Sequence, residues 1–238
     1  MLRVQNRPAP PPLRFETADS RRMTLLQGQR PLLLGRSDGD GCCRDLAMHR
    51  LDGYRSPLPP IRSALMRDPG NWPHRYASWL DESPESPLHD GRWELRERRE
   101  FPPYVWFSEE FVRDWPGGSL ELYCGGGWNG VLPLRRLSAP DDPRVKAYRK
   151  HVRDGTLAPV LLWRVTFLDG WLILDGHDRA LAALEEGRTP PCVVLTRVPD
   201  DENDEVTETA GTRTWPHPGG PRAWDEIAAR VMFECPRD

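Results

Sequence analysis

From Val131 onward, strand patterns and helix patterns alternate with little between them, and no other part of the sequence constrains the fold as tightly. The apolar runs are separated by the hairpin dipeptide Asp169-Gly170 and by helices that stop at Gly155 and Gly187. The predicted elements are strands at 131–134, 160–167, 171–174 and 193–195 and helices at 144–153 and 180–186. This stretch is therefore expected to form the regular core of the chain.

One turn in this stretch, Asp175-Gly176-His177-Asp178-Arg179, lies between an apolar strand and an amphipathic helix. Gly176 allows close backbone approach, and the helix after it presents unpaired amides and a positive dipole, so an anion fits there. His177 and Arg179 add side-chain donors, while Asp175 and Asp178 could hold Mg²⁺ or accept a proton. The turn is thus expected to bind phosphate. A structural alternative stays open, in which Asp178 caps the helix and Arg179 is solvated.

The stretch from about residue 131 to 197 resembles the ParB/sulfiredoxin-like domain family. The resemblance rests on the opening strand Leu132-Pro133-Leu134, the segment from Gly155 to Leu161, and D-G-H-x-R-x-x-A-A in a strand-turn-helix context. It covers between a quarter and a third of the chain. The resemblance implies an α+β fold with a small mixed β-sheet and flanking helices, and a nucleotide whose phosphates lie on the turn.

Departures from the pattern separate the members of that family. Sulfiredoxins carry a reactive Cys followed by His in the turn, where this chain has His177 and Asp178. DNA-segregation members carry an arginine-rich turn and a DNA-binding domain after it, whereas this chain continues with an acidic linker at 200–205 and one helix at about 221–233. Both of these functions are therefore disfavoured.

The kinase-like members have a D-G-H-H-R turn, from which this chain departs only at Asp178. The resemblance implies that ATP, or another nucleoside triphosphate, is bound by Asp175, Gly176, His177 and Arg179. It also implies that Mg²⁺ lies near Asp175 or Asp178. A carboxylate in place of the second His puts a negative charge beside the phosphates, so Asp178 is either a metal ligand or a sign of lost chemistry.

Kinase-like members place an acidic general base after the first strand, and Asp141 and Asp142 occupy the comparable region here. The resemblance implies that one of them deprotonates an acceptor hydroxyl or a water, with His177 as a further catalytic candidate. The alternative for the carboxylate pair is a purely structural role as charges at a helix N-terminus. We therefore expect ATP-dependent phosphoryl transfer to an acceptor of unknown identity, or hydrolysis of the nucleotide.

Basic residues gather on the helix predicted at 144–153 and just before it. They are Arg135, Arg136, Arg144, Lys146, Arg149, Lys150, His151 and Arg153. Such a run is usually a solvated helix face, but it could contact nucleotide phosphates or a nucleic-acid strand. A nuclease or DNA-associated protein is therefore an alternative, and a degenerate protein that only senses a nucleotide or interacts with partners is another.

The chain before Val131 is expected to be an extension of the core. Residues 1–20 are predicted to form an extended arm, because the prolines between Arg7 and Pro12 fix φ and remove donors. Residues 21–130 are predicted to form an irregular α+β extension packed on the core at 131–198. Residues 199–238 are predicted to be an acidic linker with one helix.

Loop patterns dominate the extension between 36 and 103. The elements expected in it are a hairpin at 22–26 and 32–35, short helices at 61–67, 74–81 and 109–115, and a strand at 120–123. The run from Gly125 to Gly130 matches G-x-G-x-x-G, but Pro133 forbids the helix that would hold a pyrophosphate. No dinucleotide site is expected there.

The composition excludes some classes of protein. With 238 residues and a formal net charge of −3, the chain can bury one good core but has no global field that would hold it on a polyanion. A strongly basic DNA-binding protein is therefore disfavoured. No apolar run is long enough for a signal peptide or a membrane span, and the cysteines form no C-x-x-C pair. We expect a cytoplasmic protein with no membrane partner, and its preference for arginine over lysine is typical of a GC-rich bacterium.

Overall fold

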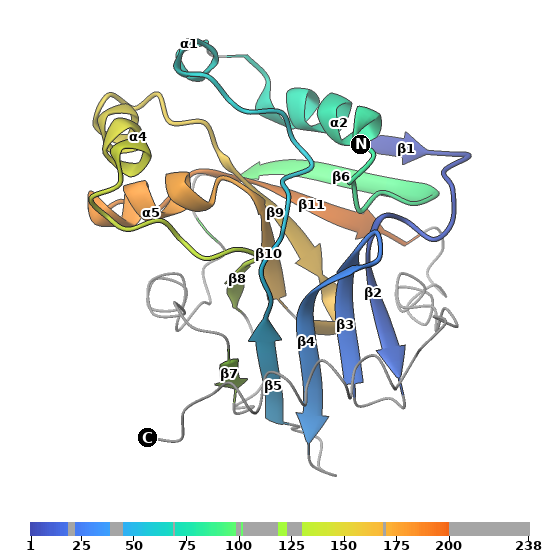
Figure 1. The fold of residues 1–238 in the computed structure, drawn as a ribbon. Helices are drawn as coiled ribbons and strands as arrows, with labels where there is room; N and C mark the ends of the chain where they lie inside the picture. The colour runs from blue at the N-terminus through green and yellow to red at the C-terminus, as the bar shows by residue number, and fades with distance from the viewer. Residues whose placement is uncertain are drawn as a thin grey trace, which may run out of the picture.

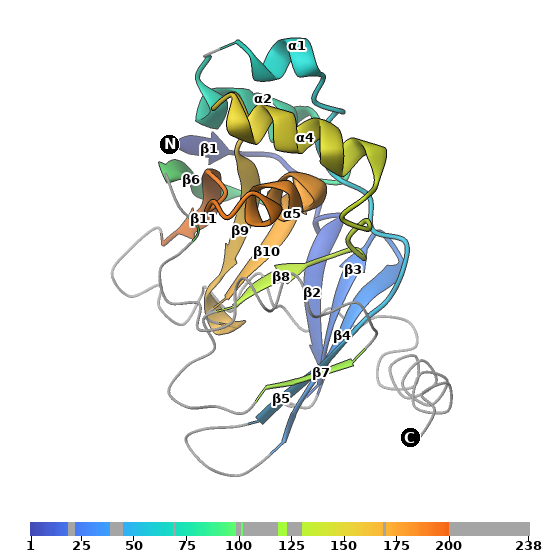
Figure 2. The same cartoon turned by 90° about the vertical axis from the view of Figure 1, so that its left-hand side faces the viewer.

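The computed structural model describes residues 1–18, 22–38, 45–68, 70–98, 101, 119–122, 130–168 and 170–199. These residues form an α+β fold with two β-sheets (Figures 1 and 2). The helices expected at 109–115 and 221–233, the acidic linker and most of the glycine-rich run before Val131 lie outside the described residues.

The larger sheet has six strands and is mixed. Its order is β1 (Leu2–Val4), β6 (Gly91–Arg98), β11 (Cys192–Val198), β9 (Val160–Val165), β10 (Gly170–Asp175) and β8 (Val131–Pro133). β11 is parallel to β9 and β8 is parallel to β10, while the other neighbouring pairs are antiparallel. The strands predicted after Val131 and the antiparallel pairing of β9 with β10 are confirmed, but Thr166–Leu168 forms a 3-10 helix where the end of the strand was expected, and Asp169 of the predicted turn lies outside the described residues. Two strands from the N-terminal part complete the same sheet.

The helices predicted after Val131 are also confirmed. They are α4 (Pro143–Arg153) and α5 (His177–Glu185), which pack on each other, while α5 also packs on β9 (Figure 2). α1 (Ser63–Met66) and α2 (Trp72–Glu82) match the two short helices expected there, and α2 packs on β6. Within the described ranges, no helix is long and apolar enough to cross a membrane.

The smaller sheet is antiparallel throughout and lies beside β8 and β10 in Figure 1. Its strands in order are β2 (Leu13–Ala18), β3 (Arg22–Gln27), β4 (Arg30–Asp38), β5 (Asp45–Arg50) and β7 (Ser119–Leu122). The expected hairpin is the β3–β4 pair, and the expected strand at 120–123 is β7.

One hydrophobic core joins the two sheets. Leu25 and Leu33 of the smaller sheet are buried in the same cluster as Leu161 and Leu172 of the larger sheet, and Tyr76 of α2 belongs to it as well. Because burial of apolar surface is the main driving force for folding, the residues before Val131 and those after it stabilise each other directly.

The expectation of an irregular segment at 36–103 is wrong for β5 and β6. β6 pairs with β1 on one side and along its whole length with β11 on the other. It alternates Arg and Glu, and Trp93 is its only fully buried side chain. Strand pairing supplied by neighbours, rather than an apolar pattern of its own, makes this segment a strand.

The proline-rich arm is docked and contributes to both sheets. The backbone N–H of Arg7 donates to the Asp90 carboxylate at 2.8 Å, and its guanidinium forms an ion pair with Asp81 at 2.7 Å. The residues on either side of the prolines form β1 and β2. The expected extended arm is therefore held between the larger and the smaller sheet.

Candidate functional site: a turn where two helices begin

The phosphate-binding turn predicted from the sequence joins β10 to α5. β10 ends at Asp175, Gly176 adopts a left-handed conformation with φ 94°, and α5 begins at His177. A positive φ strains any residue with a Cβ, so glycine suits this position. Gly176 is the N-cap of α5 and makes no side-chain cap hydrogen bond. The orphan amides of the first helical turn are therefore not satisfied by a capping side chain at this position.

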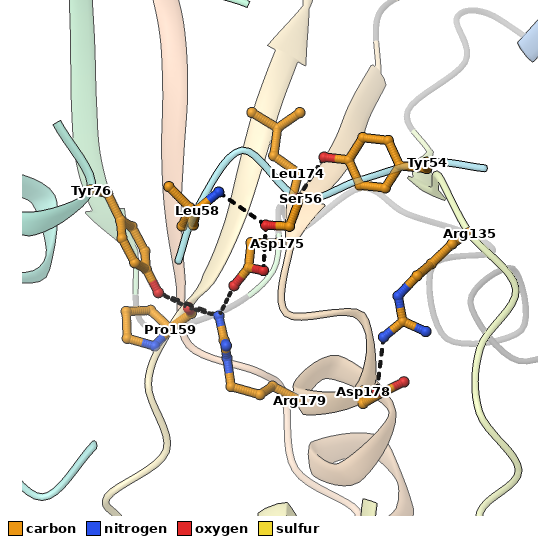
Figure 3. Close-up of polar contacts among 10 residues, drawn as sticks. All are labelled: Tyr54, Ser56, Leu58, Tyr76, Arg135, Pro159, Leu174, Asp175, Asp178 and Arg179. Atoms are coloured by element: carbon orange, nitrogen blue, oxygen red, sulfur yellow. Dashed lines mark hydrogen bonds and ion pairs between the residues drawn. The ribbon is translucent and has the colours of Figure 1, made fainter. Parts of the chain in front are cut away.

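The inner cluster, formed by Asp175, Arg179, Tyr76, Ser56 and Pro159, lies on one side of this turn (Figure 3). Arg179 is only 3% exposed. Its Nη2 donates to Asp175 Oδ2 at 2.8 Å and to the Pro159 carbonyl at 3.0 Å, and it lies 3.4 Å from the Tyr76 hydroxyl. The guanidinium expected to meet phosphate thus points into the protein, where it ties the turn to α2 and to the start of β9.

Side chains from the N-terminal extension also form hydrogen bonds with the turn and with the strand before it. The Ser56 hydroxyl donates to Asp175 Oδ1 at 2.7 Å, and the Tyr54 hydroxyl donates to the Leu174 carbonyl at 2.6 Å (Figure 3). Tyr54 and Ser56 precede their partners by 120 and 119 residues, within a segment that carries only loop patterns. No local pattern could have identified them.

His177 is buried against the end of β8. Its Nε2 accepts a hydrogen bond from the Leu134 N–H at 3.0 Å, so the ring is neutral with its proton on Nδ1. Burial, followed by the charges of Arg135, Arg50 and Arg179, lowers the pKa of His177 well below its ordinary value. A neutral, buried acceptor fixes the backbone before Arg135 and supplies no positive charge to a phosphate.

The outer cluster, formed by Asp178, Arg135 and Arg144, lies on the other side of the turn (Figure 3 shows its Asp178–Arg135 pair). Asp178 Oδ2 is 2.8 Å from Arg135 Nη2 and 3.8 Å from Arg144 Nη1. The Asp178 side chain is 3% exposed, whereas those of Arg135 and Arg144 are 35% and 68% exposed. The two arginines therefore reach solvent while their carboxylate partner does not.

Two buried polar atoms of the turn have no hydrogen-bond partner within the described part of the chain. They are Asp178 Oδ1, an acceptor, and Arg179 Nε, a donor. Buried polar groups in native proteins are almost always paired with protein, water or ligand. Of the two, Asp178 Oδ1 lies in the outer cluster beside the arginines that reach solvent, where a bound donor or cation would pair with it.

Helices α4 and α5 begin at the same place. Arg144, in the first turn of α4, reaches Asp178 in the first turn of α5, while Arg149 and Arg153 further along α4 pair with Glu186 just after α5 at 2.6 Å and 2.7 Å. The helices therefore run parallel, and the positive ends of both dipoles meet around the outer cluster. Converging helix N-termini with two arginines favour an anion more than either helix end would alone.

No family model matches the chain, and neither a curated protein nor a solved structure matches it.

Further positive charge lies behind the outer cluster. Arg50, at the end of β5, is buried and donates to the Pro133 carbonyl at 3.2 Å. Burial and then the nearby charge of Arg136 lower the pKa of Arg50 to about 10. The end of β8, from which Arg135 and Arg136 project, is thus anchored by Arg50 and His177.

The predicted carboxylates differ in what they can still bind. Both oxygens of Asp175 are engaged, one by Ser56 and one by Arg179, whereas Asp178 keeps Oδ1 unpaired. Within the described ranges, no three or more His, Cys, Asp or Glu side chains group as a metal site. Mg²⁺ that arrives with phosphates needs only one or two protein carboxylates, so of these two aspartates Asp178 fits that ion better.

The carboxylates predicted as general bases lie at the start of α4. Asp142 is the N-cap, and its side chain accepts from the Arg144 N–H at 2.7 Å. Asp141 is exposed and precedes the cap. Asp142 therefore has the structural role at a helix N-terminus that was the alternative to catalysis. Asp141 remains available to a ligand at the positive ends of α4 and α5.

Proposed function

We propose that this protein binds a nucleotide through its phosphates where α4 and α5 begin, and that it transfers or hydrolyses the terminal phosphoryl group. The observation that carries the proposal is the convergence of two helix N-termini on the solvent-reaching arginines Arg135 and Arg144. The resemblance of 131–197 to ParB/sulfiredoxin-like domains supports the same ligand.

In this proposal, the residues in and around the turn have separate tasks. Arg135 and Arg144 bind phosphate oxygens, because guanidinium groups match phosphate geometry and both reach solvent. Gly176 lets the phosphates approach the backbone amides of α5. Arg179 and His177 hold the turn in shape from the interior.

The reaction that fits this arrangement is an in-line phosphoryl transfer. An acceptor hydroxyl or a water attacks the terminal phosphorus, the bond to the bridging oxygen breaks, and the nucleoside diphosphate leaves. Asp141 takes the proton of the attacking oxygen. Asp178 would hold Mg²⁺, which neutralises phosphate charge when bound, and most of the remaining catalysis is positioning and charge stabilisation.

Titration calorimetry with ATP, ADP, CTP and GTP in the presence of Mg²⁺ tests the proposal. We expect Arg135→Ala to weaken nucleotide binding by roughly tenfold or more, because it removes a charge-assisted contact to phosphate. Arg153→Ala is the matched control, since Arg153 lies on α4 but pairs with Glu186. Absence of binding by the wild type for all four nucleotides would reject the proposal.

Release of ADP separates an enzyme from a protein that only senses the nucleotide. We expect ADP production from ATP, faster with a hydroxyl-bearing acceptor, and lost in Asp141→Asn. Binding without turnover would point to the sensing alternative. Nicking of supercoiled plasmid that disappears in Arg135→Ala would point instead to a nuclease, although the pairing of Arg149 and Arg153 with Glu186 leaves α4 less free charge for nucleic acid.

A further inference from the structure

Asp178 places a fixed negative charge inside the cationic site described above. Its side chain is 3% exposed and sits between the first turn of α5 and two arginines, 2.8 Å from Arg135 and 3.8 Å from Arg144. The arginines that would bind a phosphate are therefore already neutralised in part by an internal carboxylate. A phosphate that takes over these arginines meets a negative charge at short range, in surroundings that screen it poorly.

The unpaired oxygen of Asp178 indicates what removes that repulsion. Oδ1 is buried and has no hydrogen-bond partner in the described part of the chain, although a carboxylate oxygen is a strong acceptor and a good ligand for hard cations. A divalent cation held between Oδ1 and the phosphate oxygens would be coordinated by both anions, and this would remove the repulsion between them. Asp175 cannot do this, because Ser56 and Arg179 occupy both of its oxygens.

We infer that Asp178 is a specificity-determining residue, which makes the site accept phosphate chains complexed with a divalent cation and reject the same chains free of metal. The inference rests on the proposed phosphate site and adds to it the chemical form of the ligand. The Asp178 carboxylate competes with the phosphate for Arg135 and Arg144. A metal-free phosphate must break the ion pairs of Asp178 with these arginines, whereas a phosphate with a bound cation gains Asp178 as a ligand of that cation.

Inorganic tripolyphosphate is the sharpest probe, because it carries the phosphates without a base or a sugar. Calorimetric titrations are run with Mg²⁺ and, separately, with EDTA, on the wild type and on Asp178→Asn, which keeps the side-chain shape and removes the charge. For the wild type we expect binding at least about tenfold tighter with Mg²⁺ than without it. For Asp178→Asn we expect that ratio to fall to roughly threefold or less, mainly because metal-free binding becomes tighter.

Glu186→Gln is the matched control. Glu186 pairs with two arginines, Arg149 and Arg153, just as Asp178 does, but beside the C-terminal end of α5. Removing its charge therefore frees two arginines away from the helix N-termini, and the wild-type metal preference should remain. Asp178→Ser is a second neutral variant, to be used if the thermal melt of Asp178→Asn shows loss of the fold.

Each other result has a defined meaning. Equal affinities of the wild type with Mg²⁺ and with EDTA, or a full metal preference in both neutral variants, would overturn the role of Asp178 and leave the phosphate site standing. Failure of tripolyphosphate and of all nucleotides to bind any variant under either condition would remove the phosphate site and the inference together.

Discussion

The inner and outer clusters lie on either side of one five-residue turn, yet they differ in the hydrogen bonding of their aspartates and in the exposure of their arginines. In the inner cluster, Asp175 is saturated by two donors and Arg179 is sealed against α2 and β9. In the outer cluster, Asp178 keeps an unpaired oxygen and its arginine partners reach solvent. A carboxylate whose two oxygens are both bonded stabilises a conformation, whereas one with an unpaired oxygen can exchange its partners for a ligand. The inner cluster therefore fixes the conformation of this segment, and the outer cluster offers the groups that can bind a ligand.

The largest expected effect tests the inner cluster. Arg179→Ala leaves Asp175 without its ion-pair partner in a largely buried position, and we expect the free energy of unfolding to fall by about 3 kcal/mol or more. Urea unfolding measures it. Arg153→Ala removes an arginine that is 55% exposed, so it should cost less than about 1 kcal/mol. Equal losses for these two variants would contradict a structural role for Arg179.

Gly176 joins the two clusters, and its replacement tests how tightly the turn is built. A Cβ at this position would lie 2.8 Å from Arg179 Nη2, and φ is 94°. We expect Gly176→Ala to lower the free energy of unfolding by about 2 kcal/mol. Gly155→Ala is the control, since Gly155 also has a positive φ but has open space around it, and strain alone costs about 1 kcal/mol. If both variants lose the same stability, the contact with Arg179 contributes nothing.

His177 lies between the clusters and predicts a pH dependence. Burial lowers its pKa, so below the ordinary value of 6.5 the unfolded chain binds a proton that the folded protein does not. Stability is therefore full well above pH 6.5 and falls as the pH drops through that value, by at most about 1.4 kcal/mol at pH 5.5 for this residue. Urea unfolding at pH 7.5 and pH 5.5 measures the loss.

His177→Gln should remove this share of the pH-dependent loss and keep an acceptor for the Leu134 N–H. The pKa values of His49 and His151 are lowered too, by burial and then by neighbouring arginine charges, so a smaller dependence should remain in the variant. An unchanged difference between the two pH values would show that His177 takes up its proton in the folded state.

The smallest expected effect concerns the link from the N-terminal extension to the inner cluster. Ser56→Ala removes the hydrogen bond to Asp175 Oδ1 and should cost about 1 kcal/mol in unfolding free energy. Ser78→Ala is the control, because the Ser78 hydroxyl bonds Glu82 at 3.3 Å on an exposed helix face, and its loss should change stability by less than about 0.5 kcal/mol. A loss for Ser78 as large as that for Ser56 would contradict the bracing role of the extension.

The sequence by itself determined the order of elements after Val131 and the position of the turn. Strand runs, helix stops and a glycine before a helix are local patterns, and β8 to β11 with α4 and α5 follow them closely. It also pointed to Arg135 and Arg144 as part of a basic group. In the segment at 36–103, local patterns did not predict β6, because pairing with its neighbours, rather than its own residues, makes it a strand.

Only the tertiary structure decided which charges of the turn face inward. Arg179 is one residue from Asp178, but Tyr76 and Pro159 contact Arg179, whereas two arginines that reach solvent flank Asp178. Those partners come from other segments of the chain. Helical geometry points successive side chains in different directions, and the packing around the helix then decides which partners each of these two buried side chains meets.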